Sequence, residues 1–283
     1  MNEQKLKALF GLKHNPFSRA VPLDALWHPP GVEAFFYRVE DIVIDGGFVL
    51  ISGESGIGKS RVLQLLAARL REVGGDVVVG VMERPQSSVS DFYRELGGLF
   101  GVELSPSNRY GGFRGLRERW REHIQSTLFR PVLIVDEAQE MASYCMTEMR
   151  LLSSARFDSE CLLTTVLCGD SRLPDRFRSP DLVPLGSRIR TRWALEPWDH
   201  NTLKSFCDHA LEHAGAPHLM TAGLKNTLVE HCGGNLRLLC SMGDELLNTA
   251  AQRDLKRLDE KLYIEVYTRE PSTKRAKPSK RVK

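Results

Sequence analysis

Residues 53–60 read GESGIGKS, and this segment constrains the chain more than any other. It matches the pattern G-x-x-x-x-G-K-[ST] of loops that bind nucleotide phosphates. The glycines allow a tight curl in which consecutive N–H groups face phosphate oxygens, and a helix amino end adds positive charge. Lys59 would contact the β and γ phosphates, and the Ser60 hydroxyl would bind Mg²⁺. We predict that ATP is held by Gly53, Glu54, Ser55, Gly56, Ile57, Gly58, Lys59, Ser60 and Arg61.

The segments on either side of this loop agree with the motif. The apolar run 47–52 before it is typical of a buried parallel strand, and residues 61–70 after it have helical apolar spacing. The alternative, a chance match in a glycine-rich turn, does not explain a strand, a loop and a helix in the required order.

A second apolar run, 131–135, ends in two acids. Asp136 would hold Mg²⁺, and Glu137 would act as a general base on the attacking water. Acids also favour helix amino ends, but that explains one acid and not two after a buried strand. The sequence therefore predicts an ATP-hydrolysing enzyme.

Further strands are expected at 76–82, 162–168 and 191–195, alternating with amphipathic helices. This alternation predicts a parallel α/β sheet covered by helices on both faces. Asp170 follows one strand and is a candidate for contacting the γ phosphate or the water. It could equally be an ordinary turn residue.

Length and composition bound the remaining possibilities. The 283 residues suffice for a large α/β domain and a smaller second one, and no apolar run approaches the roughly 18 residues that span a bilayer. The amino terminus lacks the apolar segment of a signal peptide. Six cysteines form no C-x-x-C pair, which favours reduced thiols in the cytoplasm over disulfides or a zinc site.

The chain divides into three expected parts. Residues 1–197 would form a lead-in and the nucleotide-binding domain, and 198–267 a helical lid with helices near 199–214, 220–231, 235–252 and 256–267. The net charge is +3, but residues 268–283 alone carry +6 and almost nothing apolar. This predicts a disordered tail that binds nucleic acid or an acidic partner, or that only aids solubility.

Together these segments resemble the AAA+ ATPases, and more narrowly an ExeA-like branch that includes transposition regulators of the TniB, TnsC and IstB type. The resemblance covers residues 9–252. It rests on the phosphate loop, on Val135-Asp136-Glu137-Ala138, on 166–173, on Ser187-Arg188-Ile189, and on Gly234-Asn235-Leu236-Arg237.

The resemblance implies roles for residues that would otherwise look ordinary. Phe17 would pack near the adenine, and Arg237 would be the lid arginine that reaches the phosphates. Arg188, with Arg190 in reserve, would enter the neighbouring subunit's site as an arginine finger. Asp170 departs from the amide or hydroxyl that is common at its position, which puts its sensing role in doubt.

The same resemblance implies an ATP-dependent, DNA-binding regulator of transposition. Its subunits would assemble on target duplex DNA as a hexamer-like ring or a helical filament, would recruit or activate a transposase, and would disassemble on hydrolysis. Little base specificity is expected. The DNA contacts would be Arg84, Gln86, Ser87, Asn108 and Arg109, although the polar members are also good helix N-caps.

Two alternatives share the fold. One is a secretion-associated ATPase of the ExeA kind that acts on protein partners, and the other resembles a helicase loader. Because the ExeA-like secretion ATPases have a membrane anchor that this chain lacks, the sequence favours the transposition branch and no membrane partner.

Overall fold

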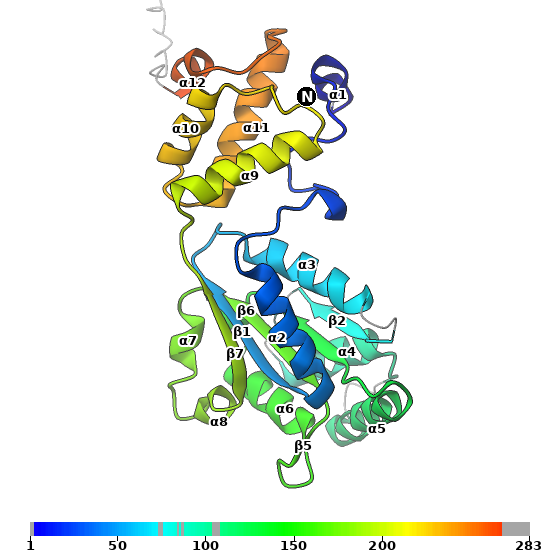
Figure 1. Cartoon of the computed structure of the whole chain (residues 1–283). Coiled ribbons are helices and arrows are strands. Elements are labelled where there is room, and N and C mark those ends of the chain that lie inside the picture. The colour runs from blue at the N-terminus through cyan, green and yellow to red at the C-terminus, as the bar shows by residue number, and fades with distance from the viewer. Residues whose placement is uncertain (1–2, 73–75, 84, 86–87, 104–107, 268–283) are drawn as a thin grey trace, which may run out of the picture. The chain divides into compact units, whose positions relative to one another are not determined.

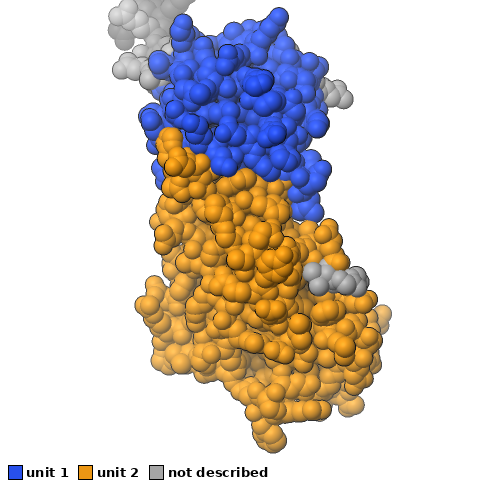
Figure 2. All heavy atoms as spheres, viewed as in Figure 1, with its two compact units in different colours: residues 1–25, 203–233, 238–283 blue, residues 26–202, 234–237 orange. Residues whose placement is uncertain are grey.

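The computed structural model describes residues 3–72, 76–83, 85, 88–103 and 108–267. The chain forms two compact units, coloured separately in Figure 2. The larger comprises residues 26–202 and 234–237, and the smaller comprises 1–25, 203–233 and 238–283. We call them the nucleotide-binding unit and the helical unit.

A five-stranded parallel sheet forms the centre of the nucleotide-binding unit (Figure 1). Its strands, in spatial order, are β2 (Val79–Met82), β3 (Val132–Val135), β6 (Thr164–Gly169), β1 (Gly47–Gly53) and β7 (Ile189–Leu195). All five expected strands are present, including 191–195. Since the strands are parallel, the segments that follow β1, β3 and β6 leave the sheet at the same edge.

Helices cover both faces of this sheet. They are α2 (Val32–Asp45), α3 (Lys59–Glu72), α4 (Val89–Phe100), α5 (Arg109–Thr127), α6 (Ser143–Ser153), α7 (Leu173–Arg176) and α8 (Val183–Gly186), with the 3₁₀ turn η2 (Ala138–Glu140). A short antiparallel hairpin, β4 (Ser154–Ala155) and β5 (Glu160–Cys161), precedes β6. The predicted α/β fold class is confirmed.

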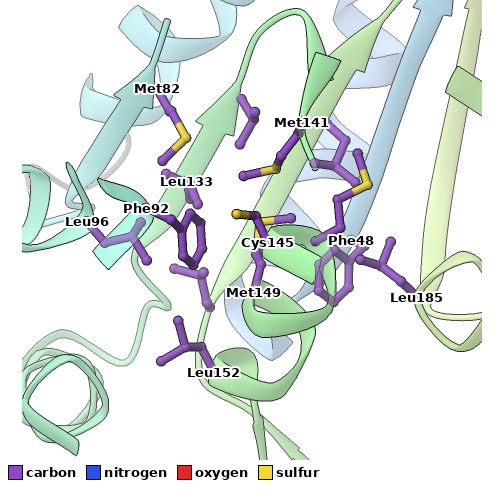
Figure 3. Close-up of a cluster of buried hydrophobic side chains, with 14 of the residues drawn as sticks. Phe48, Met82, Phe92, Leu96, Leu133, Met141, Cys145, Met149, Leu152 and Leu185 are labelled. Carbon is purple, nitrogen blue, oxygen red and sulfur yellow. The ribbon is translucent and has the colours of Figure 1, made fainter. Parts of the chain in front are cut away.

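Successive side chains of each strand point to opposite faces of the sheet, so each face carries its own layer of apolar side chains. Phe48 and Leu50 of β1 belong to a buried cluster with α4, α5, α6 and α8, shown in Figure 3. Val49 and Ile51 are fully buried and lie on the opposite face, because successive side chains of a strand alternate. A strand buried on both faces has the continuous apolar sequence that 47–52 shows.

The helical unit contains α1 (Glu3–Phe10), η1 (Leu23–Ala25), α9 (His200–His213), α10 (Ala222–His231), α11 (Leu236–Gln252) and α12 (Glu260–Tyr267). The first residues of α9 and α11 are grouped with the nucleotide-binding unit. The four lid helices lie where the sequence placed them.

The lead-in differs from its expected place. Residues 1–25 belong to the helical unit, and not to the nucleotide-binding domain as the boundary at residue 197 implied. Asn15 Nδ2 donates to Asp244 Oδ1 at 2.6 Å, and the Lys13 N–H donates to Ala214 O at 2.9 Å. These contacts join residues about 200 positions apart, so local sequence patterns do not reveal them.

In the described part of the chain, no helix combines the length and the apolar character needed to cross a membrane. All six cysteines lie within that part, and none of them forms a disulfide bond there. The same residues contain no group of three or more His, Cys, Asp or Glu side chains arranged to hold a metal ion.

Candidate nucleotide-binding site

The phosphate loop joins β1 to α3 in a backbone conformation that needs glycine. Gly56 and Gly58 have φ of 88° and 107°, a region that costs residues with a Cβ roughly 1–2 kcal/mol. A Cβ built on Gly56 would also lie 2.4 Å from Asn235 Oδ1. Helix α3 begins at Lys59, so its positive amino end adjoins the loop.

Three loop carbonyls accept hydrogen bonds from residues more than 100 positions away. Ser55 O accepts from Asn235 Nδ2 at 2.9 Å, Gly56 O from Arg237 N at 2.8 Å, and Ile57 O from Trp198 Nε1 at 2.7 Å. We call Trp198, Asn235 and Arg237 the loop clamp. Because these donors satisfy the loop carbonyls, they hold the backbone in its curled form. The sequence had indicated only Arg237, whose Nη1 also donates to Ser55 Oγ at 3.0 Å.

The residues expected to hold phosphate and metal lie together. Lys59 is 8% exposed, and its ammonium donates to Gly53 O at 2.9 Å and Glu54 O at 2.8 Å. These acceptors are carbonyls and not carboxylates, so its positive charge stays available for an anion. Ser60 Oγ donates to Asp136 Oδ2 at 3.0 Å, which unites the loop with the end of β3. A hydroxyl and one carboxylate are oxygen ligands that suit Mg²⁺ with bound phosphates and water. These residues fit ATP with Mg²⁺.

Glu137 occupies an unusual backbone position. Its φ and ψ are 49° and 37°, the left-handed region, and its N–H donates to Asp136 Oδ1 at 2.9 Å. Non-glycine residues in this region cost about 1–3 kcal/mol, and they concentrate at functional sites. The bend directs the chain into η2 immediately after β3.

Gln139, which the sequence analysis did not single out, contacts the Glu137 side chain. Gln139 Nε2 donates to Glu137 Oε2 at 2.6 Å, and Gln139 Oε1 accepts from the Asp170 N–H at 3.0 Å. The amide thus connects the acid after β3 with the end of β6. Its place two residues after Glu137 is the one sequence signal that could have indicated it.

The Asp170 carboxylate is engaged elsewhere. It accepts from Arg172 N at 2.9 Å and Arg172 Nε at 2.7 Å, and Arg172 also donates to Glu140 at 2.8 Å. The hydrogen bond from the Arg172 guanidinium lowers the pKa of the Asp170 carboxyl. The end of β6 thus presents an ion-paired acid, with the Gln139 amide beside it.

The two finger candidates lie at the other edge of the sheet. Ile189 pairs with Phe48 and Leu195 with Gly53, so the amino end of β7 is about 20 Å along the strand from the phosphate loop. Arg188 forms an ion pair with Asp158 in the β4–β5 hairpin and donates to Pro184 O. Arg190 donates to Gly46 O at 3.2 Å and lies 3.6 Å from Asp45.

Phe17 lies in the core of the helical unit. It is 4% exposed, and its ring occupies the space beside Gly243 of α11, where a Cβ would meet ring carbons at 2.7 Å. Its adenine contact stays a prediction.

Of the expected DNA contacts, the structure describes Asn108 and Arg109. Arg84, Gln86 and Ser87 lie outside the described residues. Asn108 is the N-cap of α5, and its Oδ1 accepts from the Gly111 N–H at 2.8 Å. The capping alternative therefore applies to Asn108.

Arg109 binds a buried acid. Its Nε donates to Glu148 Oε2 at 3.0 Å, and Tyr93 Oη donates to the same oxygen at 2.9 Å. Burial raises the pKa of Tyr93, and the hydrogen bond to Glu148 raises it further. The hydroxyl therefore stays protonated and donates to Glu148. Arg109 thus joins α5 to α6, and its expected contact with DNA stays a prediction.

Comparisons with known proteins agree with this geometry. Residues 44–177 match a family described as an AAA domain. The ORC2 protein of Aeropyrum pernix is 15% identical with a TM-score of 0.66, covering 90% of this chain and 70% of that one. The chain has the AAA+ fold. Domain III of the Thermotoga maritima replication initiation protein DnaA is 20% identical with a TM-score of 0.61, covering 89% of this chain and 97% of that one.

A relative with an assigned name is general secretion pathway protein A of Aeromonas hydrophila. It is 29% identical over an alignment of 252 residues, and the match covers 86% of this chain and 44% of the relative. The chain therefore spans less than half of that relative's length.

Proposed function

We propose that this protein is an ATPase that works as a nucleotide-dependent switch. The observation that carries the proposal is the hydrogen bond between Ser60 and Asp136, with Lys59 in the same loop and Glu137 next to Asp136. The groups proposed to bind phosphate, to hold the metal and to activate water thus lie together at one edge of the sheet.

In this mechanism the loop N–H groups, Lys59 and the amino end of α3 bind the phosphates of ATP. Ser60 and Asp136 would hold Mg²⁺, which supplies positive charge to the β and γ phosphates. Glu137 accepts a proton from the water that attacks the γ phosphorus. Arg237 lies against Ser55 of the loop, and we assign its guanidinium to the phosphates.

A second copy of the chain would complete the site. Arg188 and Arg190 lie at the edge opposite the phosphate loop, so neither can serve its own subunit's nucleotide. An arginine delivered by a neighbour would stabilise the charge that develops at the γ phosphate. ATP would then favour the assembled state, and hydrolysis would weaken it.

Two substitutions test the ATPase. Lys59→Ala should abolish binding of a fluorescent ATP analogue. Glu137→Gln should keep that binding while lowering kcat by about 10²–10⁴-fold, the usual contribution of a general base. Arg178→Ala, at an exposed ion pair with Asp175, is the matched control for a lost charge. Hydrolysis by Glu137→Gln at the unchanged rate would contradict the proposal.

We propose that the partner of this ATPase is a protein and not DNA. The relative at 29% identity carries a secretion-pathway name, and it favours the secretion-associated alternative over the transposition regulator. Arg109, one of the expected DNA contacts, is already engaged by Glu148. We therefore propose that ATP-driven assembly acts on a protein component of a secretion apparatus.

A binding experiment with duplex DNA distinguishes a protein partner from a DNA partner. We expect the wild-type protein with a non-hydrolysable ATP analogue to form oligomers in light scattering and negative-stain images without DNA. Binding to random-sequence duplex at low salt, where phosphate contacts are strongest, should be weak and independent of the nucleotide. Filaments on DNA only with the ATP analogue would overturn the protein-partner proposal and restore the transposition reading.

A further inference from the structure

The Gln139 side chain lies between the two strand ends that matter most for hydrolysis. Its Nε2 donates to Glu137 Oε2 at 2.6 Å, and its Oε1 accepts from the Asp170 N–H at 3.0 Å. The partners define which end of the amide is which, because a carboxylate can only accept and an N–H can only donate.

Several features hold this amide in place. Arg176 Nη1 donates to Gln139 O at 2.6 Å, and the adjacent Ala138 is fully buried. A Cβ on Gly169 would lie 2.4 Å from Gln139 Oε1, so a glycine at the end of β6 leaves the space that the amide occupies.

We propose that Gln139 is a positioning residue that holds the Glu137 carboxylate for catalysis and couples it to the end of β6. This deepens the proposed ATPase function and rests on it. The Asp170 side chain at this strand end is a carboxylate, which offers no amide and accepts from Arg172. Gln139 supplies that neutral amide from η2 instead.

The chemistry gives Gln139 a defined role. During hydrolysis the water oxygen forms a bond to the γ phosphorus, and the bond from that phosphorus to the oxygen bridging it to the β phosphorus breaks. The electron pair leaves with ADP, and the water proton goes to Glu137. The Gln139 amide binds one carboxylate oxygen and leaves the other for the water. As a neutral donor, it orients the base without competing for the proton.

The coupling follows from the second hydrogen bond. A displacement of the Asp170 N–H at the end of β6 moves Gln139 Oε1, which accepts from it. The Gln139 Nε2 group, which donates to Glu137, moves with it because both atoms belong to one amide. The base thus senses the conformation of the strand end through a single side chain.

The kinetic test uses the full chain and compares kcat with ATP affinity. Gln139→Ala should lower kcat by at least about tenfold, less than loss of the base itself, with unchanged ATP-analogue binding. Gln139→Glu replaces the amide donor by a carboxylate, which can only accept, so it should lower kcat at least as much as Gln139→Ala. Gly169→Ala should resemble Gln139→Ala because it displaces the amide. Gln125→Ala, on the exposed face of α5, is the control.

A double-mutant cycle separates positioning from a general structural effect. If Gln139 acts through Glu137, Gln139→Ala should lower kcat no further in the Glu137→Gln background. An unchanged kcat in Gln139→Ala, or full additivity in the double variant, would overturn the proposal.

Side-chain amide NMR keeps the proposal testable without turnover. With ¹⁵N-labelled glutamine, the Gln139 Nε2 resonance is the one that disappears in Gln139→Glu. We expect its chemical shift to differ between the wild type and Glu137→Gln, because the substitution changes the acceptor of its hydrogen bond from a carboxylate to an amide. A resonance insensitive to Glu137→Gln would refute the contact. Absent hydrolysis in a wild type whose resonance does respond to Glu137→Gln would instead count against the proposed ATPase function alone.

Discussion

Removal of Arg109 offers a quantitative test of how α5 is attached to α6. Arg109 and Arg114 lie on the same helix, and each pairs with a glutamate. The Arg109 partner, Glu148, has a side chain 8% exposed, whereas the Arg114 partner, Glu118, has one 52% exposed. Arg114→Ala is therefore a matched control for the charge and the helix.

The expected difference follows from the burial of the acid that is left behind. Exposed i,i+4 pairs contribute little because water screens them, so Arg114→Ala should leave the free energy of unfolding nearly unchanged. Breaking a fully buried pair costs about 3–5 kcal/mol. The Arg109 side chain is itself 62% exposed, and Tyr93 still donates to Glu148, so we expect about 2 kcal/mol for Arg109→Ala.

Urea denaturation followed by circular dichroism measures this difference, and Tm should fall by about 4–8 °C for Arg109→Ala. Glu148→Gln in the same chain should recover part of the loss, because it removes the unpaired charge. If Arg109→Ala is as stable as Arg114→Ala, Arg109 does not anchor α5, and its role as a DNA contact regains support.

Three further perturbations test other parts of the site. Gly56→Ala should lower ATP-analogue affinity by about 5–30-fold, measured by fluorescence titration, because its left-handed φ costs roughly 1–2 kcal/mol; unchanged affinity would contradict the loop geometry. Asp158→Asn should release Arg188 and raise the ATPase rate at low protein concentration by at most about fivefold, since an exposed pair contributes about 0.2–1 kcal/mol; a lower rate would show that the pair supports the active form. Asp170→Asn should be less stable than the wild type near neutral pH. Because the folded pKa of Asp170 is lowered, its stabilisation is present above the unfolded value of about 3.9 and is lost as pH falls through the folded pKa, so acid unfolding curves of the two proteins should converge there.

The sequence was sufficient where the function of a residue depends on its neighbours in the chain. The phosphate loop can be predicted from the sequence because its glycines, Lys59 and Ser60 all lie within eight consecutive residues. The two acids at the end of β3 were visible for the same reason, since a buried strand and its final residues are read from one segment. The four lid helices follow from apolar periodicity, and the buried strands follow from short continuous apolar runs.

The sequence was insufficient where a contact joins distant segments. Trp198 binds a loop carbonyl 141 positions away, and Asn235 binds one 180 positions away. Neither residue has a local pattern that distinguishes it from a surface tryptophan or an asparagine before a helix. The expected roles of Arg109 and Phe17 were also formed without knowing that a buried glutamate and a lid glycine would face them.

The residues proposed to bind phosphate are therefore adjacent in the sequence, whereas the contacts that hold them in position come from the tertiary fold. A phosphate-binding loop needs only backbone conformation and a few adjacent side chains, which the chain encodes in order. The attachment of Gln139 to Glu137 and Asp170, the clamp on the loop and the ion pair of Arg188 each require strand ends or loops to meet in space. Such meetings depend on how the parallel sheet and its crossover helices close, because hydrogen bonds act over about 3 Å whatever the separation along the chain.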